Sequence, residues 1–208
     1  MDYGYITIKG SAEASFIERK SEFIGYIKHV ETPEEAIEFI NEIKAKHRKA
    51  THNVYAYVLR DNNISRYSDD GEPQGTAGVP VLDVILKQNL TNVCVVVTRY
   101  FGGVLLGGGG LVRAYSHSCK IAIDASQKMN MCQCSEITAI CDYSMYGKIS
   151  NILPNYEVKI TDTVFEDNVT IKILVKTQNL TLLSDKLIDI SNGQIILEKS
   201  DIFYADFA

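Results

Sequence analysis

The chain has 208 residues, 26 acidic against 21 basic side chains, a net charge of −5 and 46% apolar residues. This composition is typical of a soluble globular protein, and its acidic balance argues against generic nucleic-acid binding. No apolar run approaches the roughly 20 residues that span a bilayer. The start, MDYGYITIKG, lacks the basic region and apolar core of a secretory signal. We therefore expect a cytoplasmic protein with no membrane contact.

Cysteine usage agrees with a reducing compartment. The chain has five cysteines, an odd number: Cys94, Cys119, Cys132, Cys134 and Cys141. Two of them lie within predicted strand or helix cores, which is typical of free cytosolic thiols. Cys132 and Cys134 lack the second pair or nearby histidine that a zinc site needs. No metal or other cofactor is expected.

The first half of the chain predicts a sheet with helices on one face, an α/β arrangement. Thr32 and Glu35, with Pro33 between them, form a capping box for the first helix. That helix closes at the basic cluster 44–49, which suits the negative end of the helix dipole. The predicted strands are Tyr3–Lys9, Ala12–Glu18, Phe23–Val30, Val54–Leu59 and Val93–Thr98, and the later helices are Val79–Lys87 and Leu111–Lys128.

An acidic turn precedes the second helix, in the run YSDDGEPQGTAGVPVLDVI at residues 67–85. Asp69-Asp70-Gly71 is a turn signal, and residues 76–80 predict a helix start. Carboxylates at Asp69, Asp70 and Glu72 suit either Mg²⁺ or general acid–base chemistry. No nucleophile or suitably spaced histidine accompanies them, and His52 is interpreted as a turn or core-edge residue. An enzyme is therefore the less favoured interpretation.

The most informative run is VTRYFGGVLLGGGGLVRAY, residues 97–115, between a buried strand and a helix. Six glycines lie between Arg99 and Arg113. A phosphate loop needs a lysine after its last glycine, and a dinucleotide fingerprint needs a small residue where Val112 stands, so neither motif is present. Free amides at a helix start beside cations suit an anion. The alternative is that the glycines only let strand and helix pack closely.

Polar side chains recur on one face of the helix that follows this loop. Arg113, His117, Lys120 and Asp124 share that face. Arg113 is predicted in the first turn, where the helix dipole disfavours a cation. Two explanations are weighed equally: a bound anion, and an ion pair with Asp69, Asp70 or Glu72.

The second half predicts the β-α-β-β-α-β order of a ferredoxin-like domain. The expected elements are a strand at Cys134–Asp142, a helix at Tyr146–Leu153, strands at Tyr156–Phe165 and Asn168–Lys176, a helix at Leu180–Ile190 and a strand at Gln194–Tyr204. Residues 1–128 contain 15 basic and 15 acidic residues, whereas residues 129–208 contain 6 and 11. The boundary is placed near residues 128–133, which gives domains at 1–130 and 131–208.

Several spaced motifs together resemble the YigZ/IMPACT family. They are SDDGEPQGTAG, VVVTRYFGG and LGGGGLVRAY, with THNVYAY and KSEFIGYI upstream. The resemblance covers residues 1–128 by motif and the remainder by layout. It implies an α+β protein whose N-terminal α/β domain resembles domain IV of elongation factor G, with a C-terminal ferredoxin-like βαββαβ domain that resembles domain V.

The resemblance also implies a link to translation. Eukaryotic IMPACT is a cytoplasmic regulator of translation that competes for the activator of the kinase that senses uncharged tRNA. This sequence lacks the ubiquitin-like-folded domain that binds that partner. For bacterial members, association with nucleic acid or the ribosome has been proposed.

We therefore weigh three functions. The favoured one is a translation-associated regulatory binding protein that contacts RNA or the ribosome through the glycine-rich loop. The alternatives are a hydrolase of a small phosphorylated or peptidic substrate, which would use the Asp69-Asp70-Glu72 turn, and a protein-interaction module with a protein partner. The candidate binding residues are Asp69, Asp70, Glu72, Thr76, Arg99, Tyr100, Gly102, Gly103, Gly107, Gly109, Gly110 and Arg113, with no catalytic or metal-binding residue.

Overall fold

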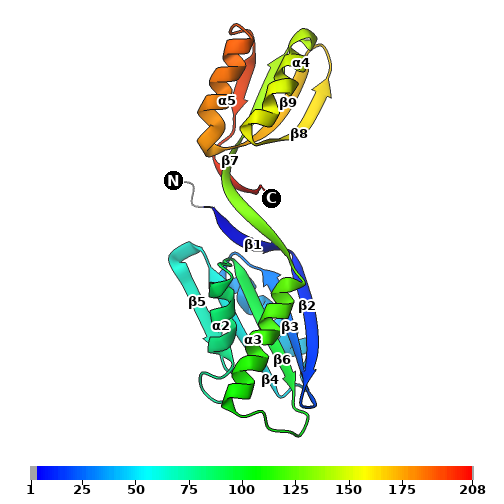
Figure 1. Ribbon diagram of the computed structural model, residues 1–208, viewed down its shortest axis with the longest axis vertical. Coiled ribbons are helices and arrows are strands. Elements are labelled where there is room, and N and C mark those ends of the chain that lie inside the picture. Colours follow the sequence, from blue (N-terminus) through cyan, green and yellow to red (C-terminus); the bar gives the residue numbers. More distant parts are fainter. Residues whose placement is uncertain (1–3, 208) are drawn as a thin grey trace. The chain divides into compact units, whose positions relative to one another are not determined.

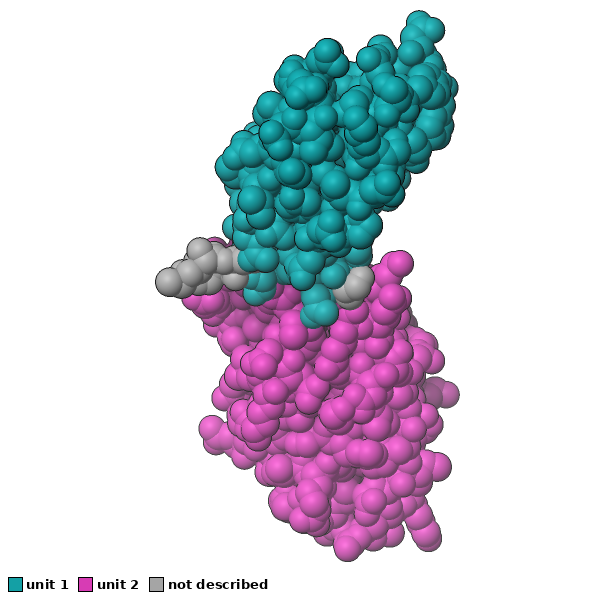
Figure 2. Space-filling model, turned by 45° about the horizontal axis from the view of Figure 1, so that its top comes forward, with its two compact units in different colours: residues 1–4, 130–208 teal, residues 5–129 magenta. Residues whose placement is uncertain are grey.

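The computed structural model describes residues 4–207, so Tyr3 of the first predicted strand lies outside the described residues. The chain forms an α+β protein with two antiparallel sheets (Figure 1). Its contacts divide it into two compact units, coloured separately in Figure 2. We call residues 5–129 the N-terminal unit and the part from residue 130 onward the C-terminal unit.

The N-terminal unit is built on a five-stranded antiparallel sheet in the order β2-β3-β6-β4-β5. The strands are β2 (Ser11–Glu18), β3 (Ser21–His29), β4 (His52–Leu59), β5 (Ile64–Ser68) and β6 (Val93–Tyr100). A 3₁₀ turn, η1 (Asp61–Asn63), joins β4 to β5. The short strand β5 was not predicted from the sequence, because it is only five residues long and none of its residues is fully buried.

Helices cover both faces of this sheet, so the expectation of helices on one face was wrong. One face packs on α1 (Pro33–Lys46), and the other packs on α2 (Gly78–Lys87) and α3 (Gly108–Asp124). Figure 1 shows α2 and α3 side by side in front of the strands. The reason lies in β6, where Val93 to Val97 are all fully buried and therefore need cover on both sides.

Local signals account for the helix starts. The hydroxyl of Thr32 accepts a hydrogen bond from the backbone N–H of Glu35 at 3.2 Å, as expected at an N-cap. Helix α3 begins at Gly108, three residues before the predicted start, so Arg113 lies beyond its first turn. The dipole penalty expected for Arg113 is therefore smaller, because that effect fades within the first turn.

Strand β1 (Tyr5–Lys9) does not join the five-stranded sheet, although the sequence predicts the first three strands as consecutive antiparallel strands. Within the N-terminal unit it contacts β3, where the Thr7 hydroxyl lies 2.8 Å from His29 Nδ1, and the segment before β6. The backbone N–H of Thr91 donates to the carbonyl of Ile6 at 3.0 Å, and Ile8 is fully buried in the core below α2 and α3.

The C-terminal unit has the predicted β-α-β-β-α-β order, with its last strand split in two. Its elements are β7 (Gln127–Cys141), α4 (Tyr143–Ile152), η2 (Leu153–Tyr156), β8 (Val158–Phe165), β9 (Val169–Lys176), α5 (Thr177–Ile190), β10 (Ile196–Lys199) and β11 (Phe203–Asp206). The first three residues of β7 belong to the N-terminal unit. Strand β7 pairs with β9 on one side and with β10 and β11 on the other, and β8 pairs with the far edge of β9. Its separate core includes Ile137, Ile149, Ile171 and Leu187.

No helix within residues 4–207 combines the length and the apolar character needed to cross a membrane.

Candidate functional site

Two of the three acidic residues of the predicted turn are used by the fold. The Asp69 carboxylate accepts hydrogen bonds from the backbone N–H groups of Gly75, Ala77 and Gly78, at 2.9, 3.1 and 2.8 Å. It therefore caps α2, whose own N-cap residue, Ala77, has no polar side chain. The Asp70 carboxylate accepts from the Asn53 backbone N–H at 2.7 Å and from the Lys44 ammonium at 2.8 Å.

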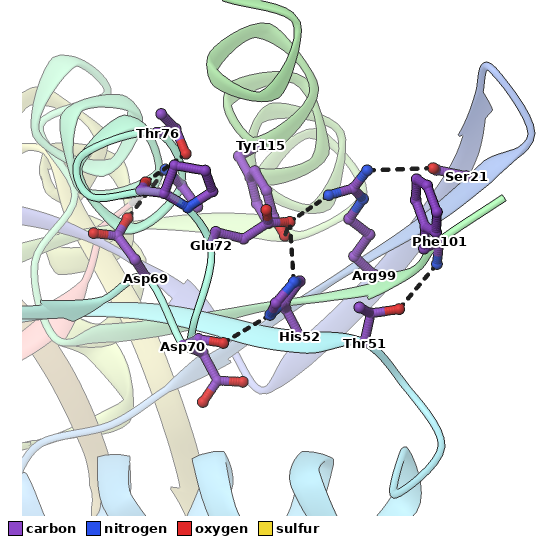
Figure 3. Close-up of polar contacts among 12 residues, drawn as sticks. Ser21, Thr51, His52, Asp69, Asp70, Glu72, Thr76, Arg99, Phe101 and Tyr115 are labelled. Carbon is purple, nitrogen blue, oxygen red and sulfur yellow. Dashed lines mark hydrogen bonds and ion pairs between the residues drawn. The ribbon is translucent and has the colours of Figure 1, made fainter. Parts of the chain in front are cut away.

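The third acidic residue, Glu72, lies at the centre of a buried polar cluster (Figure 3). Its side chain is 4% exposed. Its Oε1 atom accepts hydrogen bonds from Arg99 Nη1 at 2.6 Å and from the Tyr115 hydroxyl at 2.7 Å, and lies 3.8 Å from His52 Nε2. Burial and the Glu72 carboxylate both raise the pKa of Tyr115, so its hydroxyl stays protonated and donates.

Arg99 is as buried as its carboxylate partner, with a side chain that is 6% exposed. Its Nη2 atom lies 3.5 Å from the Ser21 hydroxyl, and its guanidinium lies over the rings of Phe23 and Phe101, each with its centroid 5.4 Å away. The Nε atom is buried with no hydrogen-bond partner. The positive charge of Arg99 is therefore balanced by Glu72 rather than free for a ligand.

Strand alternation separates Arg99 from Tyr100. Successive side chains of a strand point to opposite faces of its sheet. Arg99 points to the face covered by α2 and α3, whereas the Tyr100 hydroxyl hydrogen-bonds His47 Nδ1 at 2.9 Å, just beyond the end of α1. The structure therefore does not bring Tyr100 together with the other candidate residues.

A hollow of about 440 Å³ opens beside this buried cluster. We call it the apolar hollow. Its floor includes His52, Glu72 and Arg99, and the first turn of α3 contributes Gly107 and Gly108. The remaining wall and rim are largely apolar and include Pro73, Phe101, Leu105, Leu106 and Leu111. Phe101 and Leu105 are 46% and 81% exposed, so the rim carries unusual apolar surface for a loop.

The glycines of the loop have different structural causes. A Cβ atom on Gly102 would lie 1.9 Å from the Lys20 carbonyl oxygen, because this loop packs directly on the β2–β3 turn. Gly103 and Gly107 have φ angles of +82° and +72°, which L side chains rarely adopt. Gly109 and Gly110 lie in the first turn of α3, where the N-cap, Gly107, offers no side-chain cap.

Arg113 lines a second hollow, of about 250 Å³, which we call the cationic hollow. Its charged lining residues are Arg19, Arg113 and one carboxylate, Glu18, and its other lining residues include Leu106, Gly110 and His117. Arg113 is exposed and makes no hydrogen bond or ion pair with residues 4–207. The pairing alternative therefore finds no support, since Asp69, Asp70 and Glu72 are bound to other groups.

The structure thus divides the candidate residues between several places. Glu72, Arg99 and Gly107 line the apolar hollow, and Gly110 and Arg113 line the cationic hollow. Leu106 belongs to both hollows, so they are neighbours. The Thr76 hydroxyl donates to the Pro73 carbonyl at 2.6 Å, and Asp69 and Asp70 bind backbone amides, so these three residues shape the turn.

The candidate binding residues omitted most of the residues that line the apolar hollow, among them His52, Phe101 and Leu105, and also Tyr115, which donates to Glu72. From the sequence, Phe101 is one of five aromatic residues that could stack on bases, although it is not among the candidate binding residues. Leu105 also had a signal, because an apolar run inside a glycine-rich loop has no core to enter. His52 and Tyr115 could not be placed, since their contacts with Glu72 join residues 20 and 43 positions apart. Within the described residues, no three His, Cys, Asp or Glu side chains gather as metal ligands would.

Comparisons with known proteins follow the division into two units. Residues 19–123 match the family described as Impact N-terminal domain, and residues 140–194 match a domain of unknown function, DUF1949. The chain is 36% identical over 209 residues to the IMPACT family member YvyE of Bacillus subtilis, covering 100% of this chain and 96% of that protein.

Two solved structures give further likenesses. The crystal structure of a hypothetical protein aligns with a TM-score of 0.61 and 30% identity, covering 93% of this chain and 96% of that one. The two-domain translational regulator Yih1 is a more distant structural neighbour, with a TM-score of 0.39, 26% identity and coverage of 57% of this chain and 48% of that chain. On the family matches and the full-length similarity to YvyE, the chain belongs to the IMPACT family and has the two-domain composition of its bacterial members.

Proposed function

We propose that this protein is a cytoplasmic, translation-associated regulatory protein that contacts RNA, free or within the ribosome, through the cationic hollow. The observation that carries the RNA contact is Arg113, a guanidinium that is exposed and without an ion pair in the described part of the chain. Arg19 lines the same hollow, and its interaction with Glu18 is a long one at 3.9 Å. Guanidinium groups bind phosphate with strong, directional hydrogen bonds.

The adjacent backbone adds to this cationic character. Gly110 lies in the first turn of α3, where N–H groups have no partner within the helix and the dipole favours an anion. Arg99, by contrast, is not part of the proposed phosphate contact. To bind a phosphate it would have to break its ion pair with Glu72, and an unpaired buried carboxylate is unfavourable. Of the two arginines that flank the loop, only Arg113 is therefore available to contact phosphate, together with its neighbours.

The translation link rests on family membership and on the resemblance to elongation factor G. The C-terminal strand order, with β10 and β11 next to β7, then β9 and β8, is the order of a ferredoxin-like sheet and supports the likeness to domain V. The hydrolase alternative loses support because Asp69 and Asp70 are bound to backbone groups and only Glu72 lines a hollow.

The test is RNA binding by Arg113→Ala, measured by fluorescence anisotropy with a labelled single-stranded RNA dodecamer over a range of salt concentrations. Loss of one charge-assisted phosphate contact is expected to weaken binding by about 1–3 kcal/mol. The slope of log K against log salt should fall by about 0.7 for single-stranded RNA. Arg66→Ala, an exposed arginine on β5, is the matched control.

Unchanged affinity and unchanged salt slope in Arg113→Ala would overturn the proposal. Binding of a protein from the translation machinery that is equally strong at low and high salt, with no RNA binding, would favour the interaction-module alternative instead.

A further inference from the structure

The apolar hollow is not explained by phosphate binding, because its only guanidinium is already paired with Glu72. Two atoms of its floor nevertheless have no hydrogen-bond partner among the described residues, and a third contact orients a ring. Glu72 Oε2 makes no hydrogen bond with residues 4–207, whereas Oε1 accepts two. Arg99 Nε is buried without a partner. His52 Nδ1 lies 2.8 Å from the Asp70 carbonyl oxygen, which can only accept.

The last contact fixes the His52 ring. Because a carbonyl oxygen accepts, Nδ1 carries the proton, and Nε2 is the nitrogen left for other partners. Nε2 lies 3.8 Å from Glu72 Oε1. The floor of the hollow therefore presents Glu72 Oε2, which accepts no hydrogen bond from the described residues, and the oriented His52 ring, beside the buried guanidinium of Arg99.

The walls suit a flat apolar group. Phe101 has the Arg99 guanidinium over its ring and remains 46% exposed, and Leu105 is 81% exposed at the rim. Figure 3 shows Phe101 beside Arg99, with His52 nearby. Aromatic rings beside a guanidinium are the groups on which nucleic-acid-binding proteins stack unpaired bases.

The charges of the two neighbouring hollows indicate which class of ligand could bind. The apolar hollow and the cationic hollow share Leu106, so a ligand with an anionic group next to a planar ring fits both. Nucleotides have this composition. We propose that the apolar hollow accepts an unstacked base of single-stranded RNA, and that Glu72 favours a base that carries an exocyclic amino group. This inference rests on the proposed RNA contact and deepens it.

A protein side chain is a poorer occupant. An alkyl or phenyl group seated over Glu72 would remove its free carboxylate oxygen from water without offering a donor, which is costly. An amino-bearing base supplies that donor, as in the carboxylate contact with cytosine N4. Uracil has no exocyclic amine, and its two carbonyl oxygens flank its single N–H and face the carboxylate unfavourably.

The test compares labelled RNA dodecamers of cytidine and of uridine, which carry the same phosphates. The full-length protein should bind the cytidine dodecamer at least about five-fold more tightly, the low end of the effect of one good base contact. Phe101→Ala should weaken cytidine binding by about five-fold or more, because stacking is lost. Glu72→Gln should remove the preference for cytidine.

Matched variants separate binding from folding. Leu105→Ser should weaken binding of the cytidine dodecamer, whereas Leu182→Ser on α5, with 62% exposure, should not. Chemical denaturation of each variant checks that the fold is retained. Equal affinity for the two dodecamers, or full retention of the preference in both Phe101→Ala and Glu72→Gln, would overturn the inference.

The nucleosides cytidine and uridine, which lack phosphate, separate this inference from the proposed function. Cytidine should shift the amide signals of Gly107 and Gly108 in NMR spectra at lower concentration than uridine. If cytidine shifts them but neither dodecamer binds, the hollow accepts a base and the RNA contact fails. If the dodecamers bind with equal affinity through Arg113 and cytidine shifts nothing, the RNA contact stands and the base site fails.

Discussion

Arg99 ends β6 and Arg113 lies in the second turn of α3, with one glycine-rich loop between them. Arg99 is 5% exposed and bound to Glu72, whereas Arg113 is exposed and has no ion pair among the described residues. The sequence around each arginine gives similar signals, since both adjoin glycines at an element boundary. The difference shows that an arginine beside a glycine-rich loop indicates a phosphate site only when no carboxylate of the protein already neutralises it.

The two arginines also differ in what their loss should cost. A buried ion pair holds its members because an unpaired buried charge is unfavourable, so it belongs to the fold. An exposed cation contributes little to stability and is available to a ligand. Four predictions test this contrast, beginning with the variant for which we expect the largest effect.

Replacing Arg99 by methionine should lower the free energy of unfolding by about 3–5 kcal/mol, because the Glu72 carboxylate stays buried without its partner. Arg113→Met should change it by less than about 0.5 kcal/mol. Denaturant titration followed by circular dichroism measures both. The double variant Arg99→Met with Glu72→Gln should recover part of the loss. Equal losses from the two arginine variants would contradict the contrast.

The glycines at the two ends of the loop should differ in the same way, with one needed for stability and the other not. Gly102→Ala places a Cβ atom 1.9 Å from the Lys20 carbonyl oxygen, and relief of that overlap should cost about 2–3 kcal/mol. Gly108→Ala meets nothing closer than 3.9 Å and lies in a helix, so it should be neutral or stabilising by about 0.5–1 kcal/mol. Thermal unfolding of both variants gives the comparison. A larger loss in Gly108→Ala would show that the loop does not pack on the β2–β3 turn.

Tyr115→Phe removes one of the two hydrogen bonds to Glu72 Oε1 and should cost about 1.5 kcal/mol. The pKa of Tyr115 is raised in the folded state, mainly by burial, so folding favours its neutral hydroxyl. This contribution is complete below the unfolded tyrosine pKa of about 10 and is lost as the pH rises above it. The unfolding free energy of the native protein should therefore fall more steeply above pH 10 than that of Tyr115→Phe. Parallel pH profiles would exclude this role.

The smallest effect concerns the domain boundary, predicted at residue 130. A fragment of residues 1–130 should unfold cooperatively, since the core beneath α2 and α3 lies within residues 5–129. The difference in stability between Arg99→Met and Arg113→Met should be the same in the fragment and the full chain within about 0.5 kcal/mol. An unfolded fragment would show that the boundary is misplaced.

Much of the fold could be predicted from local patterns. The run from Val93 to Val97 predicted a buried strand, and Thr32 with Glu35 predicted a helix start that the structure contains. The order of elements after Cys134 was also predicted, because turns and periodicity change clearly between them. The split between β10 and β11 was not, since Ser200 pairs through its hydroxyl with β7 and interrupts an otherwise uniform run.

The candidate site was less predictable because it depends on partners far along the chain. Nothing local to Arg99 indicates that Glu72 neutralises it, and nothing local to Asp69 indicates that it caps a helix. The grouping of Arg99 with Tyr100 failed for a simpler reason, since neighbours in a strand face opposite sides. That rule was available from the sequence alone.

Asp69 reaches forward to amides six, eight and nine residues later, and this reach has a consequence for what similarity within the family means. Within the segment SDDGEPQGTAG, Asp69 caps α2 and Glu72 neutralises the buried charge of Arg99, and the fold needs both whatever the protein binds. A relative that had exchanged one ligand for another would still carry both. Similarity in this segment therefore reports the scaffold, and a change of ligand is expected to alter the apolar residues at positions 101 and 105 instead.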